Sequence, residues 1–307
     1  MDGVLVVDKP AGPTSHDIVD RVRRALGTRR VGHTGTLDPF ATGVLPVCVG
    51  RATRLARFLS GGDKEYLATV RLGFATTTDD ATGEPLGEAR PAGVAEEALA
   101  AALATLVGSF DQVPPAFSAK HVGGRRLYEF ARRGEAVVRA AVPVTVHALD
   151  LLAHRGDEVE ILVRCSPGTY VRALARDLGE RLGAGGHLTA LRRTRSGAFD
   201  LQGAVPGNDL AAAAASLRPL SGLLLDLPAV RVGDAGRAHL VHGRELTKDL
   251  VLAGFPEAPF DRVRVLDEAG DLLALAVPRG LLPAEPGGPP RFPALHPDLV
   301  LAGATDS

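Results

Sequence analysis

The chain has 307 residues, of which 45% are hydrophobic and 23% are charged. This length and composition exclude a disordered or fibrous protein and leave room for one large domain and a small one. The 35 basic and 36 acidic residues nearly cancel, so the charge of the whole chain predicts no polyanionic partner.

The first sixty residues predict a strand, a helix and a rigid loop. Residues 3–7 are a short apolar run that prolines and a glycine end. Thr14 or Ser15 can cap a helix that Gly27 closes, since apolar residues recur at helical spacing between them. Residues 31–45 are too rich in Gly, Thr and Pro for a helix and predict an ordered loop. The elements expected next are a buried strand at 44–49 and a basic helix at 51–59.

The middle of the chain predicts strands with a few helices between them. Two alternating runs, 144–154 and 158–165, flank Arg155-Gly156-Asp157, which predicts an antiparallel hairpin. Because the order lacks a regular strand–helix–strand rhythm, we expect an α+β fold with a mixed, mainly antiparallel central sheet and flanking helices. The other expected strands are at 64–73, 118–122, 137–146 and 187–194, and the expected helices are at 94–107, 126–133 and 169–182.

The last third of the chain has a different texture and predicts a second domain. The Ala-rich segment around 211–215 predicts a helix, and short strands are expected at 262–266 and 272–277. We place the boundary near residue 226, which gives a first domain at 1–226 and a small β-rich domain at 227–307.

Cysteine content and apolar runs indicate the compartment. Cys48 and Cys165 are too few for a disulfide framework or a zinc site, so both predict core residues in a reducing environment. No segment approaches about 18 consecutive apolar residues, and no basic stretch precedes the short apolar run at the start. We therefore expect a cytoplasmic protein with no membrane association.

Basic residues are concentrated in two blocks. Residues 1–60 hold nine Lys and Arg against five Asp, and residues 164–195 hold seven Arg against two acidic residues. The three tyrosines, Tyr66, Tyr128 and Tyr170, each lie two residues from a Lys or Arg. Because aromatic rings stack on bases while cations hold phosphates, this pattern indicates nucleic-acid binding. Scattered surface charge and buried strand tyrosines are the alternative interpretation.

Residues 32–45 form the most constrained stretch of the sequence. Three glycines permit close approach of the backbone, and Pro39 biases Asp38 toward an extended conformation. Asp38 is therefore presented from a rigid loop as a candidate for chemistry, with a simple Asp-Pro turn as the alternative.

Arg172 is a second candidate. It lies in the first turn of the helix expected at 169–182, where the helix dipole disfavours cations, and its neighbours at four-residue spacing are Gly168 and Arg176. Arg172 thus requires a carboxylate or phosphate from elsewhere, for which Asp38 is the natural candidate, unless the arginine is simply exposed.

Ordered motifs in the first 200 residues resemble one known family. The pattern Gly-x-Leu-Asp-Pro-x-Ala-x-Gly-x-Leu at 35–45 is similar to the catalytic motif of the pseudouridine synthases, and specifically of the TruB family, which modifies uridine 55 in the T-loop of transfer RNA. The resemblance covers about residues 3–200 and is weak beyond Gly207. Further matching motifs are Asp8-Lys9-Pro10, Gly32-His33-Thr34-Gly35, Lys64-x-Tyr66, Pro114-Pro115-x-x-Ser118-Ala119, Gly168-Thr169-Tyr170-x-Arg172 and Leu191-Arg192-Arg193.

The resemblance implies both a fold and an activity. It implies a pseudouridine synthase domain at 1–226 with an RNA-gripping insertion at about 113–142, and a small PUA-like or related RNA-binding domain at 227–307. The implied enzyme converts uridine 55 of transfer RNA to pseudouridine by flipping the base, without cofactor or metal. Transfer RNA is then the expected partner, with no obligate protein partner.

The resemblance also assigns roles to nine residues. Asp38 would be the nucleophile, Tyr66 the ring stacked on the target uracil, and Arg172 the partner of Asp38. We expect this arginine to lower the pKa of the Asp38 carboxyl and keep it ionised. The adjacent Asp79 leaves the assignment of Asp80 open. The residues that would contact RNA or line the uracil pocket are Lys9, His33, Lys64, Asp80, Tyr170 and Leu191.

Two other classes of function fit parts of the sequence. A noncatalytic protein that binds or folds transfer RNA would explain the basic blocks and the tyrosines, but it gives Asp38 no task. A metal-dependent nuclease could use Asp38, Asp79 and Asp80 as ligands, although no acidic cluster accompanies Asp38 in the sequence.

Overall fold

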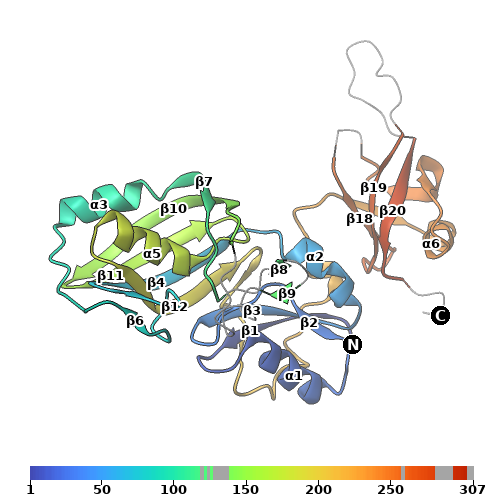
Figure 1. Ribbon diagram of the computed structural model, residues 1–307. Coiled ribbons are helices and arrows are strands. Elements are labelled where there is room, and N and C mark those ends of the chain that lie inside the picture. The colour runs from blue at the N-terminus through green and yellow to red at the C-terminus, as the bar shows by residue number, and fades with distance from the viewer. Residues whose placement is uncertain (118–120, 123–124, 127–137, 257–259, 281–292, 303–307) are drawn as a thin grey trace, which may run out of the picture.

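The computed structural model describes residues 1–117, 121–122, 125–126, 138–256, 260–280 and 293–302. These residues form a large sheet with a few helices, followed by a smaller β-rich part near the C-terminus (Figure 1). The predicted combination of a mixed central sheet and a second, β-rich part is confirmed.

Among the described residues, ten strands form the main sheet. They are β1 (Gly3–Lys9), β2 (Val31–His33), β3 (Thr42–Val49), β4 (Lys64–Leu72), β7 (Gly108–Gln112), β10 (Val142–Arg155), β11 (Glu158–Cys165), β12 (Gly186–Ser196), β13 (Phe199–Asp200) and β14 (Val205–Pro206). The order is β14-β1-β3-β12-β4-β11-β10-β7, with β2 beside β3 and β13 beside β12. The parallel pairs among these strands are β1–β14 and β3–β12, so the sheet is mainly antiparallel as predicted.

Two helices cover one face of this sheet. Figure 1 shows α3 (Glu96–Ala104) and α5 (Val171–Arg181) lying over β4, β10, β11 and β12. Leu99 of α3 and Leu174 of α5 are buried in one core cluster with Val70 and Ile161 of the sheet. Because apolar side chains fix α5 on the sheet, its first turn has a defined position.

Local sequence signals placed several elements correctly. Helix α1 (Ser15–Leu26) begins with a capping box, in which Thr14 Oγ1 accepts from the N–H of Asp17 (3.1 Å) and the Asp17 carboxylate accepts from the N–H of Thr14 (2.8 Å). Gly27 ends this helix with a φ of 62°. The hairpin of β10 and β11 is also confirmed, and Gly156 at its turn has a φ of 61°.

Other local predictions were wrong. The loop predicted at 31–45 is shortened by β2 and by the start of β3, which leaves residues 34–41, here called the acid loop. The helix predicted at 51–59 is divided into a 3-10 helix, η1 (Gly50–Leu55), and α2 (Ala56–Leu59). Residues 211–215 form turns because Ala213 is the one buried alanine among them, so no apolar stripe supports a helix.

Two short strand pairs lie outside the main sheet. They are β5 (Ala75–Thr76) with β6 (Pro85–Leu86), and β8 (His121–Val122) with β9 (Arg125–Arg126). Apart from Arg126, the helix expected at 126–133 lies outside the described residues.

In the described part of the chain after residue 226, six strands form a second sheet. Its strands are β15 (Ala229–Val232), β16 (Leu246–Thr247), β17 (Val251–Ala253), β18 (Val263–Leu266), β19 (Leu272–Arg279) and β20 (Ala294–Val300), in the order β16-β20-β19-β18-β15-β17. Helix α6 (Asp234–Val241) packs on this sheet through Leu240. No helix in the described part of the chain is long and apolar enough to cross a membrane.

An apolar seam joins the second sheet to the part of the chain that precedes it. Asp298 accepts hydrogen bonds from Arg57 (3.2 Å) and Arg262 (2.8 Å) at its edge, and both guanidinium groups lie over the Phe58 ring at 4.5 and 4.7 Å. Leucines from both sides bury each other in the seam, so the two sheets share one core cluster. Its members include Val4, Leu55, Leu59, Leu220, Leu266, Leu272, Leu275 and Leu301.

The backbones of β3 and β12 approach each other closely at Gly43. A Cβ atom there would lie 2.2 Å from the Arg193 carbonyl oxygen, and the φ of Gly43 is +102°. We expect Gly43→Ala to lower the free energy of unfolding by about 3 kcal/mol or more in urea titrations, from overpacking and backbone strain together. Gly156→Ala is the control, because its φ is +61° but a Cβ meets no described atom within 4 Å. It should cost about 1–2 kcal/mol, and equal losses for both variants would contradict the role of the close contact.

Candidate active site

The acid loop is held on both sides of Asp38. On one side, the Ser15 hydroxyl donates to the carbonyl of Leu37 (3.0 Å) and accepts from its N–H (2.8 Å). On the other side, the Lys9 ammonium donates to the carbonyl of Pro39 (3.1 Å). Because contacts from α1 and β1 hold both neighbours of the acid, the position of Asp38 is set by the surrounding fold.

The structure places Lys9, to which the resemblance assigns an RNA contact, inside the protein. It is fully buried, and its ammonium donates to the carbonyls of Pro10 (2.9 Å), Pro39 (3.1 Å) and Ala41 (2.7 Å). Burial lowers the pKa of Lys9 to about 8, while the nearby Asp38 raises it. With three backbone acceptors and no exposed surface, Lys9 supports the acid loop from inside.

Arg172 meets Asp38 through two parallel hydrogen bonds. Its Nε and Nη2 donate to the carboxylate at 2.9 and 3.0 Å, and the arginine itself is only 4% exposed. Its other contacts are with the carbonyls of Thr78 (3.0 Å) and Phe117 (2.9 Å) and the carboxylate of Asp80 (3.5 Å). The contact expected from the sequence is therefore present, and its bidentate geometry fixes the plane of the carboxylate.

The pKa of Asp38 differs from the sequence-based expectation. Burial raises the pKa of this carboxyl above its ordinary value, and Asp80 adds to the rise, whereas Arg172 and Lys9 oppose it. The side chain retains 33% of its exposed surface. The arginine thus limits a rise in pKa caused by desolvation, and it does not produce the net lowering that we expected.

Tyr66 and Arg193 are direct neighbours in the sheet. They are paired in register between β4 and β12, and both are almost fully buried. Arg193 donates to the carbonyls of Gly35 (3.1 Å) and Val44 (2.7 Å), so it supports the acid loop from the sheet. Burial raises the pKa of the Tyr66 phenol, and Arg193 opposes that rise.

Two buried residues of the site were missed in the sequence. The sequence pattern does not single out Arg193 as a site residue, although its two-residue spacing from Leu191 puts both on one face of a strand. Gln112 is 1% exposed, and its amide accepts from the N–H of Tyr170 (2.9 Å) and donates to the carbonyl of Tyr170 (3.1 Å). No local pattern marks Gln112, because its partner lies 58 positions away.

A cavity of about 520 Å³ opens beside Asp38. Its walls come from the acid loop, β4, β12 and the segment that enters α5. Two aromatic rings, two leucines and a carboxylate–guanidinium pair give it apolar walls with a few directed polar groups, as flat heterocyclic ligands require. The predicted site residues that line it are Asp38, Lys64, Tyr66, Tyr170, Arg172 and Leu191.

Lys64 lines the cavity, whereas His33 does not. Lys64 is 7% exposed, and its ammonium donates to the carbonyls of Ser60 (2.7 Å) and Gly62. Burial lowers the pKa of Lys64 to about 8, with Arg193 adding to the effect. His33 is half-buried and is not among the residues that line the cavity. Burial lowers the pKa of the His33 imidazole, and the positive charge of Arg193 lowers it further.

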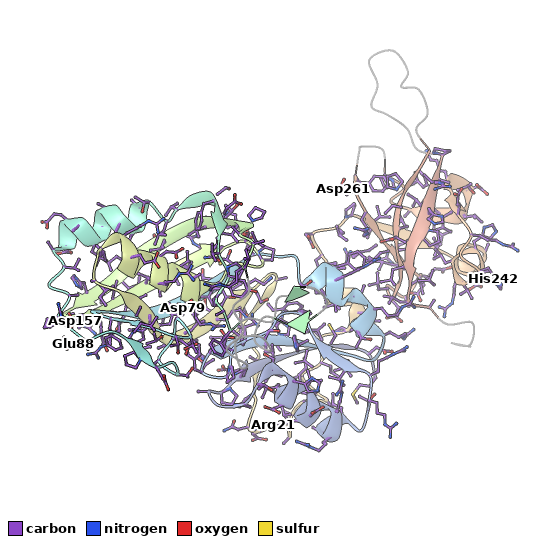
Figure 2. All side chains as sticks on the ribbon, in the orientation of Figure 1. Arg21, Asp79, Glu88, Asp157, His242 and Asp261 are labelled. Carbon is purple, nitrogen blue, oxygen red and sulfur yellow. The ribbon has the colours of Figure 1, made fainter. Side chains whose placement is uncertain are left out.

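The structure distinguishes the two adjacent aspartates of the segment between β5 and β6, where Figure 2 labels Asp79. Asp80 is buried and accepts hydrogen bonds from the Thr78 hydroxyl (2.7 Å) and from the N–H of Thr82 (2.9 Å). Its carboxylate also lies 3.5 Å from Arg172. Asp79 instead contacts Arg176 at 3.2 Å. Asp80 is thus the aspartate that adjoins the Asp38–Arg172 pair.

The arrangement of the carboxylates bears on the nuclease alternative. Asp38, Asp79 and Asp80 each face an arginine. Within the ranges that the structure covers, no group of three or more His, Cys, Asp or Glu is placed to hold a metal ion. The ligand set suggested for a nuclease is therefore not assembled by these residues.

Comparisons with known proteins agree with these features. Residues 23–171 match the TruB family pseudouridylate synthase (N terminal domain), and residues 172–227 match the tRNA pseudouridylate synthase B C-terminal domain. The tRNA pseudouridine synthase B of Leifsonia xyli subsp. xyli is 46% identical over 285 residues, which cover 91% of this chain and 93% of that protein. The same enzyme of Thermobifida fusca is 51% identical over 256 residues, covering 80% of this chain and 87% of that protein. The fold also matches a chain of a Cbf5-Nop10-Gar1 complex with a TM-score of 0.72 at 27% identity, covering 98% of this chain and 85% of that chain.

The buried position of Lys9 generates a test of stability. Lys9→Met should lower the free energy of unfolding by about 2–4 kcal/mol, because three loop carbonyls lose their donor. Removing the buried ammonium offsets only part of this loss. Urea unfolding measures this change, with Lys248→Met as the control because Lys248 is exposed. A Lys9→Met variant as stable as the wild type would show that the ammonium does not hold the loop.

Proposed function

Because the chain belongs to the TruB family of pseudouridine synthases, we propose that it isomerises uridine 55 in the T-loop of transfer RNA to pseudouridine, with Asp38 as the nucleophile. The observation that carries this proposal is the bidentate pair of Asp38 and Arg172 in the wall of the cavity. Tyr66, Tyr170 and Leu191 in the same wall support it, since they supply surfaces on which a uracil ring can pack.

The target base must leave its stack before it reaches Asp38. A uracil inside a folded T-loop is stacked, so extruding it costs a few kcal/mol. In the proposal, Tyr66 stacks on the extruded ring while Tyr170 and Leu191 enclose it, and these contacts offset the cost. Asp80 bonds a flipped nucleotide next to the pair, and His33 contacts displaced bases of the T-loop.

The reaction breaks the bond from N1 to the ribose, turns the uracil and joins C5 to C1′. It involves no redox change, so the proposal includes no cofactor. Asp38 acts as a carboxylate whether it attacks C1′, removes the 2′ proton or adds to C6 of the uracil. Arg172 opposes the rise in the pKa of Asp38 that burial causes, which favours the carboxylate at neutral pH. Tyr66 holds the base and takes part in removing the proton from C5.

The rest of the chain would bind the RNA. The exposed Arg residues of the basic blocks at 1–60 and 164–195 would contact phosphates, as would the insertion at about 113–142, whose side chains at 118–137 lie outside the described residues. In this proposal residues 1–226 are the catalytic domain, residues 227–307 are a PUA-like RNA-binding domain, and the enzyme works on transfer RNA in the cytoplasm.

Release of tritium tests the proposal against its alternatives. The wild-type protein should release tritium from a T-loop stem-loop labelled at C5 of the target uridine, since isomerisation replaces that C–H bond. Asp38→Asn should reduce turnover at least about a thousand-fold, because the reacting carboxylate is lost, while gel-shift affinity for the RNA changes little. Asp226→Asn, at an exposed position, is the matched control and should behave as the wild type.

Other outcomes would identify the competing functions. Binding of the stem-loop by the wild-type protein without tritium release would support the noncatalytic RNA-folding protein. Shortened RNA whose formation stops with a chelator would support the nuclease. Equal loss of binding and turnover in Asp38→Asn would argue against a chemical role for this acid.

The pKa of Asp38 generates a prediction about pH. Arg172 lowers the pKa of Asp38 against the effect of burial, so Arg172→Ala should raise that pKa further. Since activity requires the carboxylate and is lost below its pKa, the acidic limb of kcat/KM should move to higher pH, with kcat at neutral pH reduced. Tritium release measured from pH 5 to 8 checks this expectation. An unmoved acidic limb would show that Arg172 does not control the ionisation of Asp38.

A further inference from the structure

Helix α5 carries a second arginine one turn after Arg172. Arg172 and Arg176 are four residues apart, so they lie on the same face of the helix. Both are largely buried, with side-chain exposures of 5% and 16%. The mechanism uses only the first of them, which leaves Arg176 as a buried cation whose task has not been described.

The two arginines hold the same loop, residues 77–84, which connects β5 to β6. Arg172 Nη1 donates to the carbonyl of Thr78 (3.0 Å) and lies 3.5 Å from the carboxylate of Asp80. Arg176 Nη1 donates to the carboxylate of Asp79 at 3.2 Å. Three consecutive residues of the loop therefore contact α5, and Asp79 is the one that does so through Arg176.

Asp79 has a backbone conformation that requires support. Its φ is +61°, in the left-handed region that favours glycine. Its carbonyl accepts from the N–H of Leu188 (3.1 Å), which joins the loop to β12. A strained residue persists where its surroundings determine it, and here the buried carboxylate bound to Arg176 supplies such a contact.

The arginines also hold a second segment, residues 113–117, at the start of the expected insertion. Arg176 Nη2 donates to the carbonyl of Val113 (3.1 Å), and Arg172 Nη2 donates to the carbonyl of Phe117 (2.9 Å). Each arginine thus connects α5 to the 77–84 loop and to the 113–117 segment. Arg176 therefore repeats the two connections of Arg172, one helical turn further from Asp38.

We infer that Arg176 and Asp79 are positioning residues for the catalytic pair, an inference that rests on the proposed function for its kinetic consequences. Their ion pair holds the 77–84 loop against α5, so that Thr78 and Asp80 keep the Arg172 guanidinium in the plane of the Asp38 carboxylate. Neither residue touches the reacting atoms. Their effect reaches the reaction through the orientation of Arg172.

Several charged groups surround Asp79 and Asp38. Asp79 faces Arg176 and Arg172 from α5, Asp177 from the same helix, and Arg139. Arg176 also contacts Asp177 (2.8 Å) and lies 3.9 Å from Glu180. Around Asp38 the charged and titratable groups are Arg172, Asp80, Lys9 and Tyr66.

The test uses variants that separate the ion pair from the backbone. Asp79→Gly removes the carboxylate while glycine accepts the positive φ, so the loop is not strained further. Arg176→Met removes the cation but keeps a side chain of similar length, and the double variant completes a cycle. Arg176→Lys keeps the cation beside Asp79. Arg155→Met, at an exposed arginine of the β10–β11 hairpin outside the basic blocks, is the control.

We expect kcat for tritium release to fall about tenfold in Asp79→Gly and in Arg176→Met, with KM for the stem-loop within about twofold of the wild type. The acidic limb of kcat/KM should move to higher pH in both, since a loosened Arg172 lowers the pKa of Asp38 less. The double variant should be no worse than either single variant. Arg176→Lys should recover most of the activity, and Arg155→Met should match the wild type.

A second readout does not depend on catalysis. The ¹³C resonance of the Asp38 carboxyl in the free protein should titrate at higher pH in Asp79→Gly and in Arg176→Met than in the wild type. An unchanged titration and pH profile would overturn the inference, even if thermal stability fell, and so would losses that add in the double variant. If the wild-type protein released no tritium while the titration still moved, the proposed function would fail and the positioning role would stand.

Discussion

The contact between the Arg172 guanidinium and the Asp38 carboxylate is the interaction on which the rest of the site depends. It joins residues 134 positions apart, one in a loop between two strands and the other in the first turn of a helix. A buried ion pair is stable only when its geometry is good and its remaining donors find acceptors. Arg172 meets both conditions, because it adds the Thr78 and Phe117 carbonyls to its bonds with the acid. Three irregular segments therefore converge on one side chain.

Buried cations organise the irregular backbone around this pair. Lys9, Arg172 and Arg193 each donate to carbonyl groups of loops that form no regular ladder there. Such carbonyls need donors when they are removed from water, and a hydrogen bond from a charged donor contributes about 1.5–3 kcal/mol. Desolvation opposes this gain, and its effect is evident in the lowered pKa of Lys9 and the raised pKa of Asp38. The loops are held firmly because cations of the surrounding strands and helix reach into them.

The sequence predicted what local chemistry determines. The cap at Thr14, the end of α1 at Gly27 and the hairpin turn around Gly156 are each specified by a few adjacent residues. The rigid presentation of Asp38 and the need of Arg172 for an anionic partner followed from spacing and charge. Lys9 and Arg193 could not be placed in this way, because a Lys or Arg in a sequence is expected to be exposed and only the tertiary structure supplies its buried acceptors. The pKa of Asp38 was misjudged for the same reason, since the extent of its desolvation depends on residues distant in the chain.

The seam of leucines between the two sheets governs how the molecule comes apart. If a flexible linker joined two independent domains, the C-terminal sheet could unfold alone. Here, separating the two sheets would expose Leu266, Leu275 and Leu301 to water, together with Val4 of β1. Heating should therefore denature both sheets in one cooperative step. A fragment lacking the second sheet would expose the apolar residues of the seam to solvent and tend to aggregate.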